Sequence, residues 1–164
     1  MKLSWTIATV FGVGHMRPAP GTWGSAAAIP LAWVLHSLGG WVLLAIATLA
    51  VFVAGWWATV RETAGKDNHD PSEIVVDEVV GQWISLLPVS VGASMMGASF
   101  WALWPGILAA FVAFRLFDIT KPGPVGWADN RDDAFGVMMD DVIAGVLGAI
   151  VVVLLAGLAH GVLM

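Results

Sequence analysis

The chain has 164 residues, a net charge of −5, a hydrophobic fraction of 59% and a charged fraction of only 12%. The mean hydropathy of +0.84 lies above the range of globular proteins and favours a membrane protein over a soluble helical core. The acidic balance leaves no basic stripe, which excludes a nucleic-acid partner. The absence of cysteine excludes disulfides, thiolate nucleophiles and cysteine-ligated zinc.

The fixed charges fall into short clusters separated by charge-free stretches at 18–60, 79–114 and 142–164. A helix needs roughly 20 residues to cross the hydrocarbon core, so the first two stretches are each long enough for two crossings and the third for one. The length leaves room for one domain over 1–164. We therefore predict an all-α polytopic membrane bundle of about five transmembrane helices, with a short N-terminal interfacial or re-entrant helix.

The first predicted element is an apolar helix over 3–14, which is too short to cross a membrane. Arg17 and two prolines follow it in place of a small-residue cleavage site, so no cleaved signal peptide is expected. The crossings are predicted at 24–38, where Pro30 is expected to introduce a kink, and at 41–60, 73–91, 98–118 and 136–160. Loops or turns are predicted at 15–24, 39–40, 61–72 and 122–135.

The cationic residues all belong to one side of this topology. All seven Lys and Arg lie in or beside the N-terminal segment, the loops at 15–24 and 61–72, and the loop that follows the fourth crossing. The positive-inside rule therefore predicts that this face and the N-terminus are cytoplasmic, with the C-terminus on the other side.

Two acidic pairs, Asp77-Glu78 and Asp140-Asp141, stand immediately before apolar runs. Carboxylates in such places are costly unless they are paired or bound to a cation, although acids also favour the positive end of a helix dipole. The two pairs lie on separate predicted helices at one membrane boundary, so we expect them to converge on a divalent metal. Asp70 lies beside the start of the predicted helix that carries Asp77 and Glu78. Oxygen ligands without cysteine favour Mg²⁺.

A third charged group comprises Arg115 and Asp118 at the end of the fourth crossing and Lys121 just after it. An intrahelical ion pair is the alternative interpretation of the first two. The acids of the following loop, Asp129, Asp132 and Asp133, are interpreted as solvated.

The loop HMRPAPGTWGS offers a possible anion site. Gly21 allows close backbone approach, Thr22 and Ser25 carry hydroxyls, the helix start has free N–H groups, and Arg17 adds a charged donor. An ordinary helix start after a Pro-rich turn is the alternative. Together with the carboxylates, the loop describes a phosphate site that needs a cation, because a phosphate is otherwise repelled by the acids.

Three blocks resemble the phosphatidylglycerophosphatase A family: RPAPGTWGS at 17–25, HDPSEIVVDEVVGQW at 69–83, and FRLFDITKPGPVGWADN at 114–130 continuing to GVMMDDVIAG at 136–145. The resemblance implies an Mg²⁺-dependent lipid phosphatase of the bacterial inner membrane, with its active site on the cytoplasmic face. Its phospholipid substrate would be phosphatidylglycerophosphate, which is hydrolysed to phosphatidylglycerol and inorganic phosphate. The chain departs from the family where a Gly-Gly pair is usual and Asp133-Ala134-Phe135-Gly136 stands instead. No oligomeric state follows from the sequence.

The resemblance carries over these residues: Pro20, Gly21, Thr22, Gly24, Ser25, Asp70, Asp77, Glu78, Gly81, Arg115, Asp118, Lys121, Pro122, Asp140, Asp141 and Gly145. The expected metal ligands are Asp70, Asp77, Glu78, Asp140 and Asp141. The expected catalytic residues are Asp77, Asp118, Asp141 and Lys121, with Asp118 either a further ligand or a general base. The phosphate is expected to contact Arg17, Gly21, Thr22, Ser25, Arg115 and Lys121. Direct attack by water and an aspartyl phospho-enzyme both remain open.

A cation-coupled transporter or channel with an acidic cytoplasmic mouth is the competing hypothesis. It requires acids near the bilayer midplane and polar residues along both halves of the path. The acids of this sequence stop at one face, which favours the enzyme.

Overall fold

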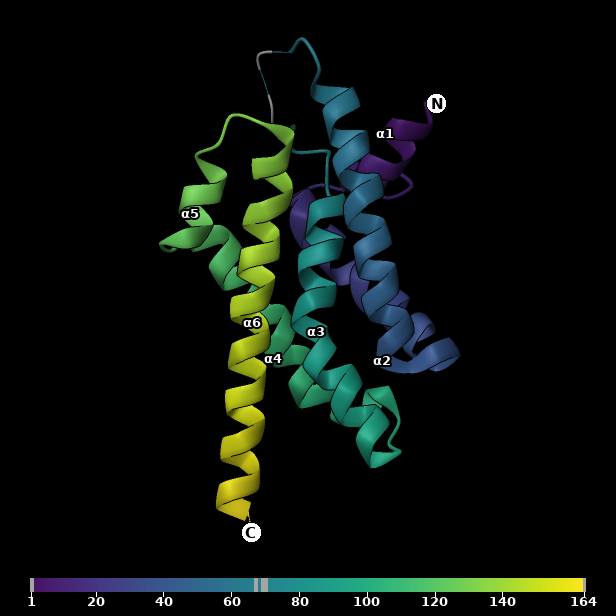
Figure 1. The fold of residues 1–164 in the computed structure, drawn as a ribbon, viewed down its shortest axis with the longest axis vertical. Coiled ribbons are helices and arrows are strands. Elements are labelled where there is room, and N and C mark those ends of the chain that lie inside the picture. Colours follow the sequence, from purple (N-terminus) through teal and green to yellow (C-terminus); the bar gives the residue numbers. More distant parts are fainter. Residues whose placement is uncertain (1, 67, 69–70, 164) are drawn as a thin grey trace.

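Figure 1 shows a computed structural model of the protein, which describes residues 2–66, 68 and 71–163. These residues form helices and no strand, which confirms the all-α prediction. The elements are α1 (Leu3–Ala8), η1 (Val13–His15), α2 (Pro20–Thr63), α3 (Val76–Met96), η2 (Phe100–Leu103), α4 (Trp104–Thr120), α5 (Pro124–Asp129) and α6 (Ala134–Leu163).

Among the described residues, four segments are long and apolar enough to cross a membrane: α2, α3, the η2–α4 segment and α6. Helix α2 is broken at Gly39 and Gly40, whose backbone angles are not helical, and Gly40 has a φ of 63° that a glycine adopts readily. The break confirms the predicted turn and divides α2 into limbs at 20–38 and 41–63. The two limbs occupy the places of the first two of the five predicted crossings.

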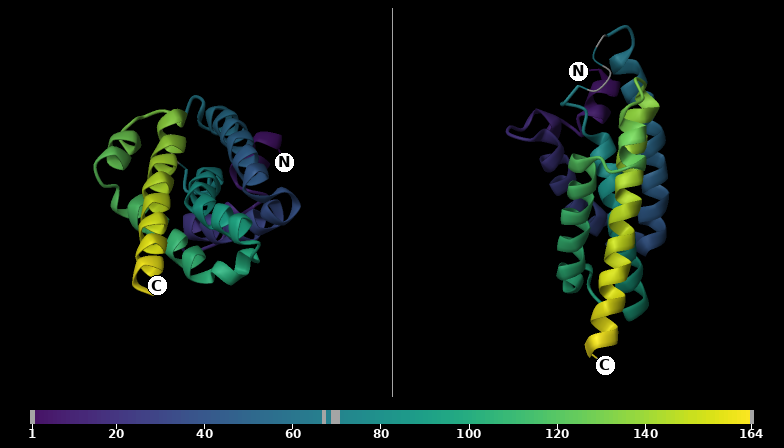
Figure 2. Two further views of the ribbon diagram at one scale, coloured as in Figure 1. Left: turned by 60° about the horizontal axis from the view of Figure 1, so that its bottom comes forward. Right: turned by 90° about the vertical axis from the view of Figure 1, so that its left-hand side faces the viewer.

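Both limbs of α2 pack against α3. The Trp83 indole donates a hydrogen bond to the Ala28 carbonyl, and His36 contacts Ser90 further along, so the limb at 20–38 runs parallel to α3. Gly55 lies against Val76 and Gly40 lies near Ser94, so the other limb runs antiparallel. Figure 2 shows α3 enclosed by α2, α4 and α6, and α3 is the most buried of the four spanning segments.

Helices α3 and α6 approach to backbone contact. A Cβ atom at Gly145 would lie 2.5 Å from the Gly81 carbonyl oxygen, and a Cβ atom at Gly148 would overlap the Ser85 hydroxyl. The Ser85 hydroxyl donates a hydrogen bond of 3.0 Å to the Gly145 carbonyl. Small residues permit such close packing in membrane helices, and here they bring the acidic pair in the first turn of α3 close to the pair Asp140-Asp141 of α6.

Several predicted boundaries differ from the structure. Helix α2 begins at Pro20, because a proline suits the first helical position, so the predicted loop at 15–24 ends at Ala19. Helix α3 begins at Val76, not at residue 73, because the Val75 N–H donates to the Ala8 carbonyl at 2.9 Å and residue 75 is not helical. Asp77 and Glu78 consequently lie in the first turn of α3, not a full turn inside it.

Other differences are local. The N-terminal helix ends at Ala8, short of the predicted residue 14. Pro30 lies inside α2, but the non-helical angles occur at Gly39 and Gly40. The predicted loop at 122–135 contains α5, which again begins with a proline.

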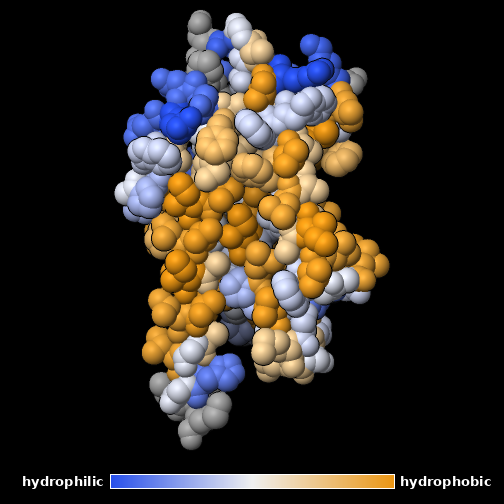
Figure 3. Space-filling view, in the orientation of Figure 1, coloured by the Kyte–Doolittle hydropathy of each residue, from blue (hydrophilic) through white to orange (hydrophobic). Residues whose placement is uncertain are grey.

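Polar residues gather at one end of the molecule. Figure 3 shows hydrophobic residues over the middle of the bundle and hydrophilic residues at the end that carries α5 and the end of α2. This is the charge partition expected of a helical bundle whose middle lies in lipid.

Candidate active site

The charged end of the bundle holds a cavity of about 270 Å³. It is formed by the starts of α2 and α3, the end of α4 and the first part of α6. Five carboxylates and two cations line it, so negative charge is in excess. The lining residues are Ala19, Pro20, Gly21, Ser72, Ile74, Asp77, Glu78, Arg115, Asp118, Lys121, Val137, Asp140 and Asp141.

Three of these carboxylates form a compact cluster. Glu78, Asp118 and Asp141 each offer an oxygen, and these oxygens lie within 4.8 Å of one another. Asp141 is only 3% exposed, and its Oδ1 has no hydrogen-bond partner within the described ranges. A buried carboxylate oxygen without a donor is unfavourable unless a cation approaches it. The all-oxygen donor set fits a hard divalent cation such as Mg²⁺.

The second acid of each predicted pair, Glu78 or Asp141, belongs to the cluster, whereas the first acid lies beside it. Asp77 Oδ1 accepts the Glu78 N–H at 2.9 Å, and Asp140 Oδ1 accepts the Asp141 N–H at 2.8 Å. Both line the cavity beside the cluster, whereas Asp118 belongs to the cluster itself. Asp70 lies outside the described residues, so its predicted role as a ligand stays a prediction.

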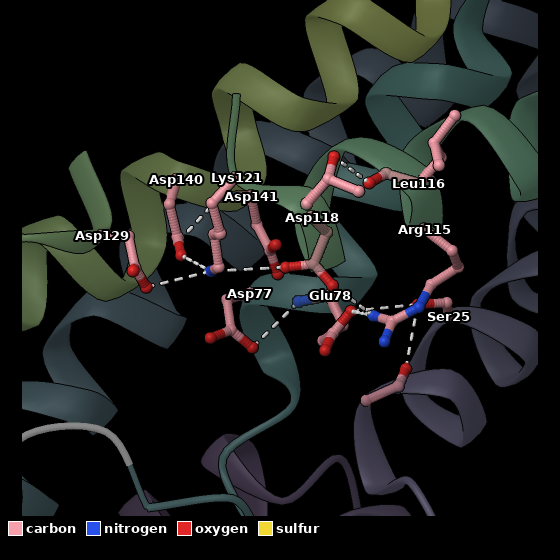
Figure 4. A network of polar contacts seen from close by, with 12 residues as sticks. Ser25, Asp77, Glu78, Arg115, Leu116, Asp118, Lys121, Asp129, Asp140 and Asp141 are labelled. Atoms are coloured by element: carbon pink, nitrogen blue, oxygen red, sulfur yellow. Dashed lines mark hydrogen bonds and ion pairs between the residues drawn. The ribbon is translucent and has the colours of Figure 1, made fainter. Parts of the chain in front are cut away.

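Two cations contact the carboxylates, as Figure 4 shows. Arg115 Nη1 forms ion pairs with Glu78 and, at 2.6 Å, with Asp118. Lys121 Nζ forms an ion pair with Asp140 and lies 3.5 Å from Asp118. The intrahelical pair between Arg115 and Asp118 is therefore present, and both residues also line the cavity.

Lys121 stays cationic in this environment. Burial lowers its pKa, but the hydrogen bond and charge of Asp140, followed by Asp118 and Asp129, outweigh burial and raise the pKa of Lys121 above its ordinary value. The amine is therefore protonated throughout the neutral range.

The predicted anion loop contributes less to the cavity than expected. Gly21 lines it, and a Cβ atom there would overlap the Glu78 carboxylate. The Ser25 hydroxyl lies behind the cavity, 3.0 Å from Glu78 Oε2. Thr22 is not in the lining, and Arg17 forms an ion pair with Glu73 at 2.8 Å. The placement follows from the early start of α2, which turns Ser25 toward α3.

One contact was missed by the sequence interpretation. Asp129, expected to be solvated, lies 3.1 Å from Lys121 Nζ and ties α5 to the site. The sequence signal for α5 was Pro124 after Gly123, because a proline in this position often begins a helix.

The comparisons identify relatives over nearly the whole chain. The sequence profile described as phosphatidylglycerophosphatase A matches residues 6–156. A protein named phosphatidylglycerophosphatase A from Haemophilus influenzae is 42% identical over 147 residues, which are 89% of this chain and 84% of the relative. Its namesake from Escherichia coli is 34% identical over 151 residues, 91% of this chain and 81% of the relative.

A protein provisionally named phosphatidylinositol-3-phosphatase, from Bacteroides thetaiotaomicron, is 38% identical over 151 residues, 89% of each chain. No solved structure gives a significant match. The profile match spans all three carboxylates of the cluster. Together with the two namesakes it shows that the chain belongs to the phosphatidylglycerophosphatase A family, a family of phosphoric monoester hydrolases.

Proposed function

We propose that the chain is an Mg²⁺-dependent lipid phosphatase that hydrolyses the terminal phosphomonoester of phosphatidylglycerophosphate to phosphatidylglycerol and inorganic phosphate. The observation that carries the proposal is the cluster of Glu78, Asp118 and Asp141 beside two cations at the charged end of a membrane bundle. The names of the Haemophilus influenzae and Escherichia coli relatives support the substrate.

The excess of carboxylates supports the need for a metal. A phosphate entering the cavity meets more negative than positive side chains, and like charges at contact distance repel strongly away from bulk water. Glu78, Asp118 and Asp141 would hold the cation, with Asp77 and Asp140 at its edge. When bound, Mg²⁺ supplies charge neutralisation and polarisation of the phosphoryl group.

The two cations of the site suit the binding of phosphate oxygens. Arg115 offers several N–H donors in a planar fork, and Lys121 offers a point charge. Both are anchored at the end of α4 by carboxylates, which limits their motion. Such preorganised donors stabilise negative charge that develops on a reacting phosphoryl group.

The surroundings of the cavity support a lipid substrate. Leu116 and Ile119, on the same helix as Arg115 and Asp118, are 55% and 67% exposed, and Trp23 is also exposed beside Gly21. Apolar side chains at this level would contact acyl chains while the headgroup lies in the cavity. The cationic residues near this end support an inner-membrane protein whose site faces the cytoplasm.

A transporter is less well supported. A second cavity lies at the opposite end of the described part of the protein, between α3, α4 and α6. It has a volume of about 440 Å³ and a lining that is apolar apart from His160. A cation path would need oxygen ligands there.

The direct test is phosphate release by the purified protein in mixed micelles, with Mg²⁺, with a chelator, and with Mg²⁺ restored. Release from phosphatidylglycerophosphate that stops on chelation and returns with Mg²⁺ is expected. Phosphatidylinositol 3-phosphate, suggested by the Bacteroides relative, and phosphatidic acid are the comparison substrates. No release from phosphatidylglycerophosphate under any of these conditions would refute the proposal.

A further inference from the structure

Gln82 is a buried polar residue whose presence the packing of the bundle does not explain. It lies on α3 in the membrane-spanning part of the protein and is 0% exposed. Neither its Oε1 nor its Nε2 has a hydrogen-bond partner among the residues that the structure describes. An unpaired buried amide lowers stability, so an apolar residue of similar size would suit the fold better.

The position of Gln82 places it directly beneath the active site. It follows Glu78 by four residues and therefore shares its face of α3. Helical side chains lean toward the N-terminus of their helix, so the amide is directed toward the turn that carries Glu78. Its neighbour Trp83 belongs with Ala28 and Ala110 to a buried apolar core of the bundle.

Arg115 approaches the same region from α4. Its neighbour Phe114 lies against Gly81, so residues 114 and 115 are level with the turn of α3 that contains Gln82. The Arg115 side chain reaches Glu78, which lies one turn from Gln82 on α3. Its Nη1 contacts Glu78 and Asp118, whereas its Nε is buried without a partner among the described residues.

The two unpaired groups are chemically complementary. The Arg115 Nε–H can only donate, and Gln82 Oε1 can only accept. The amide of Gln82 also has donors to offer to the Glu78 carboxylate, which lies on the same face. A single Gln side chain can thus serve both members of the pair above it.

We propose that Gln82 is a positioning residue for Arg115, in which Oε1 accepts the Arg115 Nε–H directly or through one enclosed water. If Glu78 and Asp118 turned toward a bound cation, their hold on Arg115 Nη1 would weaken, and the guanidinium would need a further anchor. Gln82 provides it from the membrane side and aims Nη1 and Nη2 at the phosphate. This inference rests on the proposed function and adds a residue that orients its phosphate-binding arginine.

The test compares Gln82→Met with Ser90→Ala. Gln82→Met removes the amide at nearly constant volume, so thermal stability is expected to be unchanged or higher, while kcat/KM falls about 10-fold, as for a lost hydrogen bond to a charged group. Ser90 lies on the same helix as Gln82 but far from the site, and Ser90→Ala removes its 2.7 Å contact with His36 on α2. It is expected to lower thermal stability and to leave kcat/KM unchanged.

A double-mutant cycle with Arg115→Lys shows whether Gln82 acts through Arg115. Lysine has no Nε–H of this kind, so Gln82→Met is expected to cost nothing further in the Arg115→Lys background. An equal loss in both backgrounds would indicate a structural role and overturn the proposal, as would full activity of Gln82→Met.

Phosphate binding separates this inference from the proposed reaction. Inorganic phosphate with Mg²⁺ is expected to raise the thermal midpoint of the wild-type protein, and less so for Gln82→Met. A wild type without turnover but with this Gln82-dependent shift would refute the reaction and support the role of Gln82. Normal turnover by the wild type together with an undiminished shift in Gln82→Met would support the reaction and refute the role of Gln82.

Discussion

Substitution of Gly145 by alanine tests whether the close packing of α3 and α6 sets the geometry of the carboxylates. The added Cβ would lie 2.5 Å from the Gly81 carbonyl oxygen, and 3.0 Å from the Gly81 Cα. Both atoms belong to the backbone, so no side chain can rotate away. Ordinary contact requires at least 3.4 Å, and the two helices must therefore separate by about 0.9 Å.

This displacement acts directly on the candidate site. Asp141 lies one turn before Gly145 on α6, and Glu78 lies three residues before Gly81 on α3. Their oxygens now lie within 4.8 Å of each other and of Asp118. Overpacking of this kind costs about 1–3 kcal/mol of unfolding free energy. A misplacement of about 1 Å at reacting groups costs roughly 100-fold in rate, so kcat/KM is expected to fall on that scale and the Mg²⁺ concentration for half-maximal activity to rise.

The assay is Mg²⁺-dependent phosphate release from phosphatidylglycerophosphate, together with thermal unfolding in detergent. Gly157→Ala is the matched control, because it lies on the same helix and a Cβ atom there meets no atom within 4 Å. The control is expected to keep the activity and Mg²⁺ dependence of the wild type. A Gly145→Ala protein with wild-type kcat/KM and Mg²⁺ dependence would refute the argument that this backbone contact positions the carboxylates.

Two further predictions concern single carboxylates. Asp141→Asn replaces a buried carboxylate whose Oδ1 has no hydrogen-bond partner in the described part of the chain. This change is expected to abolish Mg²⁺-dependent phosphate release with no loss of thermal stability. Near-normal activity would remove Asp141 from the site. Asp129→Asn weakens the 3.1 Å ion pair with Lys121, and because Asp129 is 41% exposed, kcat/KM is expected to fall only about 3-fold. Asp132→Asn, exposed in the following loop, is the control, and an equal effect of both changes would contradict a specific role for Asp129.

Much of the fold follows from properties that are local in the sequence. Charge-free apolar stretches predicted the spanning segments because the lipid interior excludes unpaired charges over a fixed thickness. Gly39-Gly40 predicted the turn within α2 because glycine adopts the positive φ found at residue 40. The acidic pairs predicted the end of the bundle at which the site lies, since each pair stands immediately before an apolar run.

The choice of partners within the site was decided only by the tertiary structure. The rotation of α4 brings Asp118 into the cluster with Glu78 and Asp141. Asp77 and Asp140 line the cavity at the edge of this cluster. The start of α3 depends on a hydrogen bond from Val75 to α1. These contacts join residues far apart in the chain. Hydropathy and charge therefore determined where the helices run and which end is polar, whereas the packing of α3 against α6 and α4 decided which side chains meet.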